Sequence, residues 1–296
     1  MPPRIGYPCI NRSLDCSSSR TFRLASYSEE RLIQTVSGNL DCLQRILEFN
    51  TEHNLLFFRI TSDLVPFASH PVCTYNWQDH FSEKFRSIGQ YIRKHGMRIS
   101  MHPDQFVLLN AKENRIVESS IRELQYHAEV LDLLGLDQTA RIQIHLGGAY
   151  GNKEESMKRF VSCYLSLEKP IKNRLVIEND DRIYNLSDCL EVNGKTAIPI
   201  LFDTFHYECN NTGESLKNAL DLSSKTWKKK DGPLMLDYSS QNPNGRRGSH
   251  IEHINARHFR SFLEVLGNTS ADIMLEIKDK EKSACRAERM LKQHQI

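Results

Sequence analysis

The sequence predicts an α/β protein built as a single (β/α)8, or TIM, barrel, and three observations lead to that fold class. Short apolar runs rich in β-branched residues alternate with longer amphipathic segments along all 296 residues. Such pairs occur eight times, and eight parallel strands that alternate with helices close into a barrel. Nearly every run ends in a residue able to bind a metal ion or a phosphate, on the face where barrel enzymes keep their active sites. We therefore expect one domain over residues 1–296.

The first four strand and helix pairs follow in order. Apolar runs that end in the motifs GYP, SDLVPFASH, SMHPDQF and IHLGG predict strands near residues 4–7, 55–60, 97–101 and 141–146. Helical spacing of apolar residues predicts helices near 28–50, 79–95, 113–134 and 153–169. The third helix is the clearest, because apolar residues recur from Ile116 to Leu134 and Gly135 follows as a C-cap.

The second half repeats the pattern. Runs ending in IENDD, FDTFH, LDYSS and LEIKD predict strands near residues 174–178, 198–203, 233–238 and 272–277. Helices are expected near 184–192, 214–226, 250–265 and 279–293. The longest irregular stretches, residues 8–26 and 61–78, follow strands on the active face, where long loops shape a substrate cleft.

Bulk composition is that of a globular protein. Hydrophobic residues make up 39% of the chain and charged residues 26%, which leaves enough apolar material for a large core. No apolar run approaches the roughly 18 residues of a membrane helix, and the start MPPRIGYPCI has no secretory pattern, so we expect an intracellular protein without a membrane partner. The net charge of +2 is too mild to argue for nucleic-acid binding.

Two local basic clusters occur in expected loops. Lys225 and residues 228–230 are interpreted as solvated loop charge. Arg246 and Arg247 lie in the glycine-containing segment NPNGRRGSH, just after the strand that carries Asp237. For this pair both interpretations remain open: solvated charge, or contact with a phosphate backbone.

The eight cysteines are widely spaced, and no CxxC motif occurs. This pattern argues against a zinc ribbon or a disulfide framework. We expect reduced, mostly buried thiols that do not bind a metal.

Histidines and carboxylates gather at the expected strand ends. Each histidine alone could be a structural hydrogen-bonding group, and Asp203 could simply cap the next helix. Together they outnumber the ligands of one ion, which favours a cluster of two or three ions of the kind that hydrolyses phosphoesters. Imidazole and carboxylate suit Mn²⁺, Zn²⁺ or Fe²⁺. The candidate ligands are His70, His102, His145, Glu178, Asp203, His206, Asp237, His250 and Glu276, with Tyr7 on the same rim.

At this point the sequence resembles a known family. Eight motifs occur in order over nearly the whole chain: GYPC, FRITSDLVPFASH, SMHPDQFVLLN, IHLGG, VIENDD, FDTFH, DYSSQ and LEIKDKE. They are similar to the motifs of the UV-damage endonucleases, which are relatives of the endonuclease IV barrels. The resemblance implies a barrel nuclease that nicks damaged double-stranded DNA immediately 5′ to UV photoproducts and other distorting lesions. It also implies 3′-hydroxyl and 5′-phosphate products and up to three divalent ions, typically Mn²⁺.

The resemblance also implies roles for single residues. The metal ligands would be His102, His145, Glu178, Asp203, His206, Asp237, His250 and Glu276. His70 would be a ligand or lie close to one, and Tyr7 would sit beside the scissile phosphate. Gln105 and Phe106 stand where the family places a wedge that enters the duplex, although many relatives have tyrosine at the second position and Phe106 could instead pack on the barrel top.

Strand seven departs from the family pattern. Relatives often carry a lysine two residues before a histidine ligand, and that lysine can be carboxylated. Here Met235 and Asp237 stand at these positions, which excludes the carboxylated lysine. An aspartate ligand still suits a hard divalent ion, so we expect activity with a narrower range of metals or lesions.

The expected roles are as follows. Glu178 and Glu276 hold buried ions, His102 and His145 complete one ion, Asp203 and Asp237 bind a second, and His206 with His250 binds an exposed third. Lys278 would steady the phosphate from the same side of its strand, or lie at the surface.

Two rival functions remain. One is a divalent-metal sugar isomerase or epimerase on the same barrel, although the long loops and the Gln105–Phe106 pair suit a wider cleft. The other is a lesion-binding protein without cleavage, which Met235 would suggest. A barrel whose histidines are only structural is a weaker alternative still.

Overall fold

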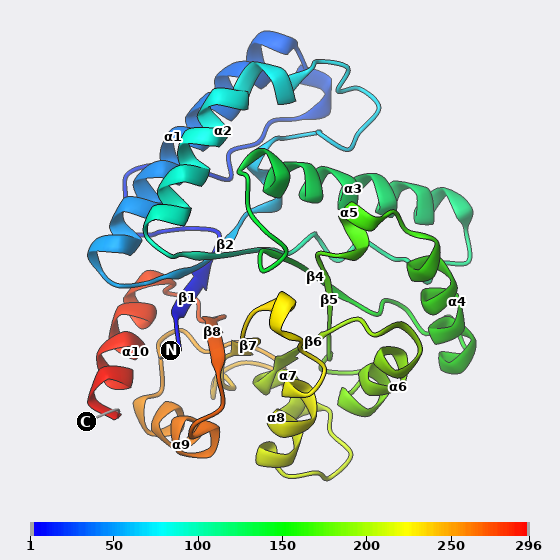
Figure 1. Ribbon diagram of the computed structural model, residues 1–296, viewed down its shortest axis with the longest axis vertical. Coiled ribbons are helices and arrows are strands. Elements are labelled where there is room, and N and C mark those ends of the chain that lie inside the picture. Colours follow the sequence, from blue (N-terminus) through cyan, green and yellow to red (C-terminus); the bar gives the residue numbers. More distant parts are fainter. Residues whose placement is uncertain (1–2, 295–296) are drawn as a thin grey trace.

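The computed structural model describes residues 3–294, and it contains the expected closed barrel (Figure 1). Each strand pairs in parallel with the next one along the chain, and the last strand pairs with the first. The strands are β1 (Ile5–Pro8), β2 (Phe57–Ile60), β3 (Arg98–Met101), β4 (Arg141–His145), β5 (Leu175–Glu178), β6 (Ile200–Asp203), β7 (Leu234–Tyr238) and β8 (Ala271–Leu275). The predicted fold class is confirmed.

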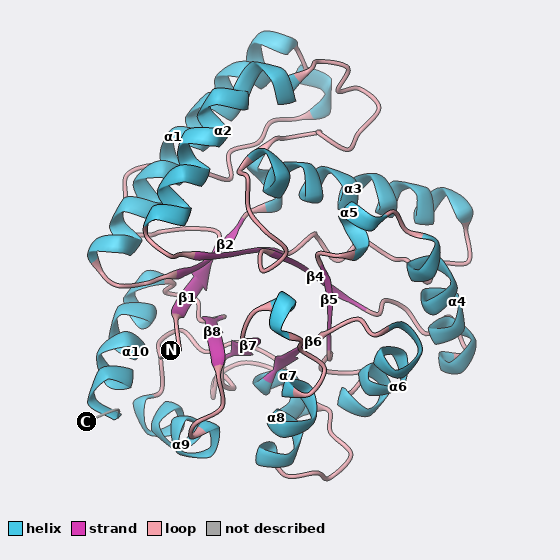
Figure 2. Cartoon of the chain, in the orientation of Figure 1, coloured by secondary structure: helices cyan, strands magenta, loops and turns pink. Residues whose placement is uncertain are grey.

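Helices surround the strands on the outside of the barrel (Figure 2). The α-helices are α1 (Glu29–Glu52), α2 (Trp77–Lys94), α3 (Asn114–Leu133), α4 (Lys153–Ser166), α5 (Lys169–Lys172), α6 (Leu186–Thr196), α7 (Thr204–Cys209), α8 (Leu216–Ser224), α9 (Ala256–Leu266) and α10 (Glu281–His294). Short 3-10 helices span Leu24–Ser26, Ser62–Leu64 and Lys229–Asp231. No described helix has the length and apolarity needed to cross a bilayer.

Two of these helices were not expected from the sequence, and one expected helix begins late. The short helices α5 and α7 follow α4 and β6 directly. The helix predicted at 250–265 begins only at Ala256, because Asn255 caps it by accepting hydrogen bonds from the first backbone amides. The residues before it form a loop in which Gln241 pairs with His250 in an antiparallel bridge.

Side chains that point into the barrel form a layer of apolar residues beneath a polar one. The apolar layer consists of Phe57, Val176, Leu201, Met235 and Met274. Side chains alternate along a strand, so the residue two positions further along each strand faces the same interior. Those positions are held by Arg59, Glu178, Asp203, Asp237 and Glu276. The barrel therefore presents a charged layer at the carboxyl ends of its strands.

A disulfide bond corrects the expectation of reduced thiols. Cys16 and Cys42 are joined, with Cα atoms 5.7 Å apart, so the loop after β1 is tied to α1. Sequence spacing could not reveal the pair, because it forms only when the loop folds back over the helix. The other six cysteines are free, but only Cys189 is buried.

Candidate metal centre

The carboxyl ends of the strands bring most of the predicted ligands together. Three overlapping groups of side chains have ligand atoms within 4.8 Å of one another. The groups are His102, His145 and Glu178; Glu178, Asp203 and His206; and Asp203, Asp237 and Glu276. Glu178 and Asp203 each belong to two groups, so the three form one continuous centre.

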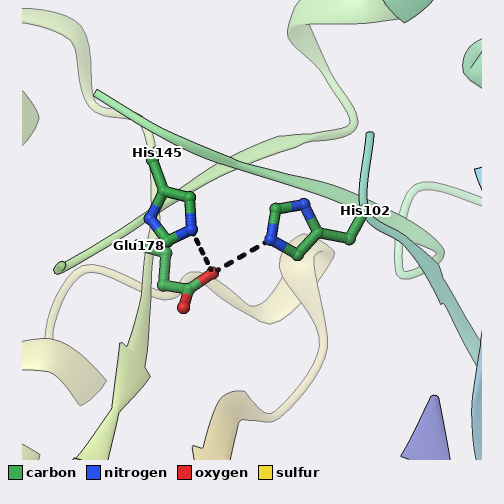
Figure 3. A group of neighbouring side chains, drawn as sticks. All are labelled: His102, His145 and Glu178. Carbon is green, nitrogen blue, oxygen red and sulfur yellow. Dashed lines mark ion pairs between the residues drawn. The ribbon is translucent and has the colours of Figure 1, made fainter. Parts of the chain in front are cut away.

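The first group contains two histidines that face one carboxylate (Figure 3). The Nε2 atoms of His102 and His145 lie 3.6 and 3.9 Å from Glu178 Oε2. These distances exceed a hydrogen bond but approach the separation of about 3.4 Å between two tetrahedral ligands with bonds of about 2.1 Å to one ion. Burial lowers the pKa of His102 to about 4, so the imidazole is neutral at pH 7, as a metal ligand must be.

The second group lies on the other side of Glu178. His206 Nδ1 lies 3.2 Å from Glu178 Oε1 and 3.5 Å from Asp203 Oδ2. It also donates to the backbone carbonyl of Asn179 at 3.0 Å, which leaves Nε2 as the ring nitrogen for a metal ion. Asp203 Oδ1 accepts hydrogen bonds from the backbone amides of Phe205 and His206, so Asp203 does cap α7. Its Oδ2 atom is buried and has no hydrogen-bond partner among the described residues, which leaves it free for a cation.

Electrostatics in this group reflect the crowding of carboxylates. Burial raises the pKa of Asp203 to about 6. Burial also disfavours charge on His206, but Asp203 and Glu178 outweigh it and raise the pKa of the imidazole to about 11. For Glu178 burial is opposed by His145 and His206, which hold the pKa of the carboxylate well below its usual range. A divalent cation would replace the proton on His206 as the partner of these carboxylates.

The third group contains a cation of its own, Arg59 from β2. Its Nη2 atom donates to Asp237 Oδ1 and Oδ2 at 2.7 and 2.6 Å, and its Nη1 atom donates to Glu276 Oε1. Burial opposes charge on Arg59, but Asp237 and Glu276 raise its pKa, so it remains a cation. Burial likewise disfavours charge on Glu276, and Arg59 nevertheless lowers the pKa of that carboxyl to about 2. Burial raises the pKa of Asp237.

His250 lies beside Glu276 at the edge of the centre. Its Nδ1 atom lies 2.7 Å from the backbone carbonyl of Glu276, which fixes Nδ1 as the donor. The other ring nitrogen is therefore the free ligand atom, and it lies 3.9 Å from Glu276 Oε2.

These donors fit a divalent-metal cluster. Four carboxylates meet around a single guanidinium, and buried charges without partners are costly. One buried carboxylate oxygen, Asp203 Oδ2, has no partner in the described chain, and the histidine Nε2 atoms point at Glu178 without hydrogen bonding to it. Nitrogen and oxygen ligands in this mixture suit first-row metals such as Mn²⁺.

An open cleft of about 860 Å³ lies over the centre. It is lined by His102, His145, His250 and Glu276 together with the predicted DNA-binding residues Gln105, Phe106, Arg246 and Arg247. Phe106 is 75% exposed, so the alternative that it packs on the barrel top is wrong. The buried neighbours Pro103 and Val107 anchor the loop that presents it.

The structure does not place Tyr7 at the centre, which corrects its expected position beside the phosphate. Its hydroxyl donates to Asn50 Oδ1 of α1 at 2.6 Å and accepts from Asn11 Nδ2 at 2.8 Å. Tyr7 lies in register with Phe58 and packs edge-on against it. Both rings point outward, into the layer between strands and helices, because side chains alternate along β1 and β2.

His70, expected to be a ligand or near one, belongs to none of the three ligand groups and does not line the cleft. It is exposed, and its Nδ1 accepts a hydrogen bond from the Val72 amide at 3.1 Å. Between β2 and His70 the chain passes through a 3-10 helix and several turns, so strand alternation does not determine the position of this residue.

The two lysines after β8 differ from expectation. Lys278 lines the cleft but forms an ion pair with Glu252 at 2.5 Å, which favours the surface interpretation. Lys280 also lines the cleft and is more buried, and this burial lowers its pKa. Lys280 is therefore the lysine better placed to meet a phosphate.

Sequence reasoning missed three polar residues at the centre: Arg59, Gln143 and Lys280. Gln143 Nε2 donates to Glu178 Oε2 and Asp237 Oδ2, at 2.9 Å each, and so joins two carboxylates. The signal for Gln143 was strand alternation, because it stands two residues before His145 on β4. Arg59 carried a similar signal, since an arginine within an apolar strand must face a polar interior.

Comparisons with known proteins agree with this geometry. A model of the UV-endonuclease UvdE family matches residues 3–295. The UV DNA damage endonuclease of Clostridium perfringens is 37% identical over 292 residues, covering 98% of this chain and 71% of the relative. The crystal structure of SacUVDE is similar with a TM-score of 0.95 and 46% identity, and the match covers 99% of each chain.

Sugar epimerases share the fold alone. The D-psicose 3-epimerase of Clostridium cellulolyticum H10 has a TM-score of 0.55 at 12% identity, covering 85% of this chain and 91% of the epimerase. The family match, by contrast, rests on sequence along nearly the whole chain. The chain therefore belongs to the UV-endonuclease family, and it is a phosphodiester hydrolase of DNA repair.

Proposed function

We propose that this protein nicks damaged double-stranded DNA immediately 5′ to UV photoproducts and other distorting lesions, and that it leaves 3′-hydroxyl and 5′-phosphate ends. The observation that carries the proposal is the exposed Phe106 beside Gln105, on the same cleft as the candidate metal centre. An aromatic side chain held out from a loop next to a phosphodiester-cleaving centre suits a duplex whose bases are unstacked at the cut.

Divalent ions, most suitably Mn²⁺, would be held by His102, His145, Glu178, Asp203 and His206, with His250 and Glu276 at the edge. When bound, such ions supply positive charge for the phosphate and lower the pKa of water. Glu178 supports this assignment, because its two oxygens face different histidines. It would therefore share its carboxylate between neighbouring ions.

The rest of the cleft would bind the duplex. Phe106 and Gln105 would fill the gap that the displaced bases leave, an aromatic ring by stacking and an amide by hydrogen bonding. Arg246 and Arg247 lie in a loop braced by Gln241, whose Nε2 donates to the Asn242 and Arg246 carbonyls at 2.8 and 3.0 Å. Both arginine side chains are exposed, so they can contact the DNA backbone.

Lesion selectivity would arise without reading a base sequence. Damaged bases stack and pair poorly, so the cost of displacing them, a few kcal/mol for intact DNA, falls at a lesion. A wedge and contacts with the DNA backbone would be enough to select lesions through this lower cost of displacing the bases. We therefore expect several distorting lesions to be accepted.

The decisive experiment is a nicking assay on an end-labelled duplex with one site-specific UV photoproduct. It should be run with Mn²⁺, with chelator, with His145→Ala and with an undamaged duplex. A single Mn²⁺-dependent cut just 5′ to the lesion, lost in the variant, is the expected result. Tight lesion binding without cleavage under any metal would instead favour a lesion-binding protein, and a cut at another position would contradict the proposed product ends.

A further inference from the structure

Arg59 is a buried cation beside the carboxylates of the centre. It is 3% exposed, and it enters the barrel interior from β2 with its guanidinium toward β7 and β8. Both terminal nitrogens are engaged: Nη2 with both oxygens of Asp237, and Nη1 with Glu276. A planar guanidinium held by one buried and one partly buried carboxylate has little freedom to leave.

This placement conflicts with a metal ion in the third group of side chains. That group consists of Asp203, Asp237 and Glu276, and Arg59 already contacts two of its three members. A divalent ion there would have to share oxygen atoms with a guanidinium or displace it. Two cations brought so close together inside a protein repel each other strongly.

Both oxygens of Asp237 also accept hydrogen bonds. Its Oδ1 accepts from Arg59, and its Oδ2 accepts from both Arg59 and Gln143. In contrast, no described residue forms a hydrogen bond with Asp203 Oδ2, which lies 3.5 Å from His206 Nδ1. The free lone pairs of the centre therefore lie on the Asp203 side and not on the Asp237 side.

The charge balance points the same way. Four carboxylates face one guanidinium, so two divalent ions with neutral histidines would leave one positive charge in excess. That excess matches the single negative charge of a phosphodiester. A third ion would leave three positive charges to be balanced.

We propose that Arg59 is a built-in cation that takes the place of a third metal ion, so that the centre binds two divalent ions and Asp237 is not a metal ligand. The two ions lie in the groups that share Glu178. Arg59 then acts as a positioning residue, which holds one oxygen of Glu276 and leaves the other toward His250. The inference rests on the metal centre of the proposed function, and it deepens that proposal.

The test counts ions without measuring activity. Purified full-length protein is stripped with chelator, loaded with Mn²⁺ and passed through a desalting column, and Mn²⁺ per chain is measured by mass spectrometry. Calorimetric titration with Mn²⁺ gives the number of sites independently. Wild type is expected to bind two ions, Asp237→Asn two ions with unchanged affinity, and Arg59→Gln three, because that variant exposes Asp237 and Glu276 to cations. The double variant should return to two.

Each outcome separates the inference from the proposed function. Three ions in wild type, or the loss of one ion in Asp237→Asn, would overturn the role of Arg59 while leaving the metal-dependent nuclease intact. Absence of any bound Mn²⁺ in wild type would overturn both. Thermal melting of the stripped proteins checks that each variant is folded, and if Arg59→Gln does not fold, the ion count of Asp237→Asn decides the question.

Discussion

The two ends of the barrel interior both contain buried charges, but the charges are arranged in opposite ways. At the amino ends of the strands, Arg98 Nη1 pairs with Asp272 at 2.8 Å, and Arg141 pairs with Asp231. Both guanidinium groups also lie over the Trp227 ring, 5.3 and 5.6 Å from its centroid. At the carboxyl ends, four carboxylates have only two cations among the described side chains of the centre: Arg59, which pairs with Asp237 and Glu276, and the protonated His206.

The difference teaches how a structural cluster is told from a functional one. At the amino end Asp231 pairs with Arg141, and Asp272 pairs with both Arg98 and Arg4, so no carboxylate of the cluster needs a ligand. At the carboxyl end negative charge exceeds positive charge, and a buried excess of this kind is stable only if cations join it. Burial of charge is common to both ends, whereas an excess of carboxylates occurs at the carboxyl end and not in the amino-end cluster.

The largest effect is expected from Glu178→Gln, a substitution at the carboxyl end of the barrel, where carboxylates are in excess. Glu178 faces His102, His145 and His206, so its loss should remove the carboxylate shared by neighbouring ions. We expect nicking of damaged duplex to fall by roughly 10³-fold or more, several kcal/mol of transition-state stabilisation. The metal-free variant should also melt below wild type, because the neighbouring histidines hold the pKa of Glu178 below its usual range, so its ionised carboxylate stabilises the folded protein at neutral pH.

The matched control for this variant is Glu191→Gln. Glu191 lies on α6 and pairs with Lys195 at the surface, so this change should alter neither activity nor melting. Nicking by Glu178→Gln at a rate close to wild type would contradict the assignment of the shared carboxylate.

The balanced end should respond in the opposite sense to Arg141→Met. The change leaves Asp231, which is only 3% exposed, without its arginine. Breaking a buried pair costs about 3–5 kcal/mol, which should lower the melting temperature by roughly 6–15 °C. Activity per folded molecule, measured well below the melting temperature, should stay near wild type.

A double variant, Arg141→Met with Asp231→Leu, sharpens this test. It also removes the unpaired charge of Asp231, so much of the lost free energy of unfolding should return. If Arg141→Met lost nicking activity without losing stability, the amino end of the barrel would have a functional role that the balanced cluster does not suggest.

Much of the centre could be predicted from the sequence because its residues stand at the ends of the predicted strands. Residues at the ends of parallel strands converge, so His102, His145 and Glu178 could be grouped from their positions along the chain alone. The same rule worked for the fold, since each strand end was marked by a polar motif. Predicted helix boundaries were wrong where a capping side chain sets them. Asn255, for example, caps α9, so this helix begins later than predicted.

Other features depend on the path of the chain, which local patterns do not encode. Tyr7 is only one residue away from an inward-facing position, yet strand alternation directs it to α1. His70 is exposed in a stretch of turns, where strand position no longer predicts the place of a side chain. The link between Cys16 and Cys42 requires a loop to fold back. Arg59 was missed because an arginine is not a metal ligand, so a pattern of ligand types does not include the cations that compete with metals.

Metal removal should distinguish the two ends by stability. A ligand at 100 times its Kd stabilises the folded state by about 2.7 kcal/mol per site, so chelation should lower the melting temperature of wild type by several degrees. Glu178→Gln should lose most of this shift, whereas Arg141→Met should keep it. An equal shift in all three proteins would mean that Mn²⁺ binds elsewhere.

The smallest effect concerns pH in the metal-free protein. Asp203 and Glu178 outweigh the effect of burial and raise the pKa of His206 to about 11, compared with an ordinary value near 6.5. Above pH 6.5 the folded protein keeps a proton that the unfolded chain releases, so this stabilisation is complete below pH 6.5 and is lost as pH rises toward 11. The loss should not exceed about 1.4 kcal/mol per pH unit.

The measurement is the melting temperature of stripped wild type and His206→Gln between pH 7.5 and 9.5, a window in which the amino-end arginines do not titrate. The difference between the two proteins should shrink steadily as pH rises. Saturating Mn²⁺ should remove this slope, because the cation replaces the proton as partner of Asp203 and Glu178. A difference that is independent of pH in the stripped proteins would mean that His206 is already neutral there, and that excess negative charge at the carboxyl end is relieved by another group.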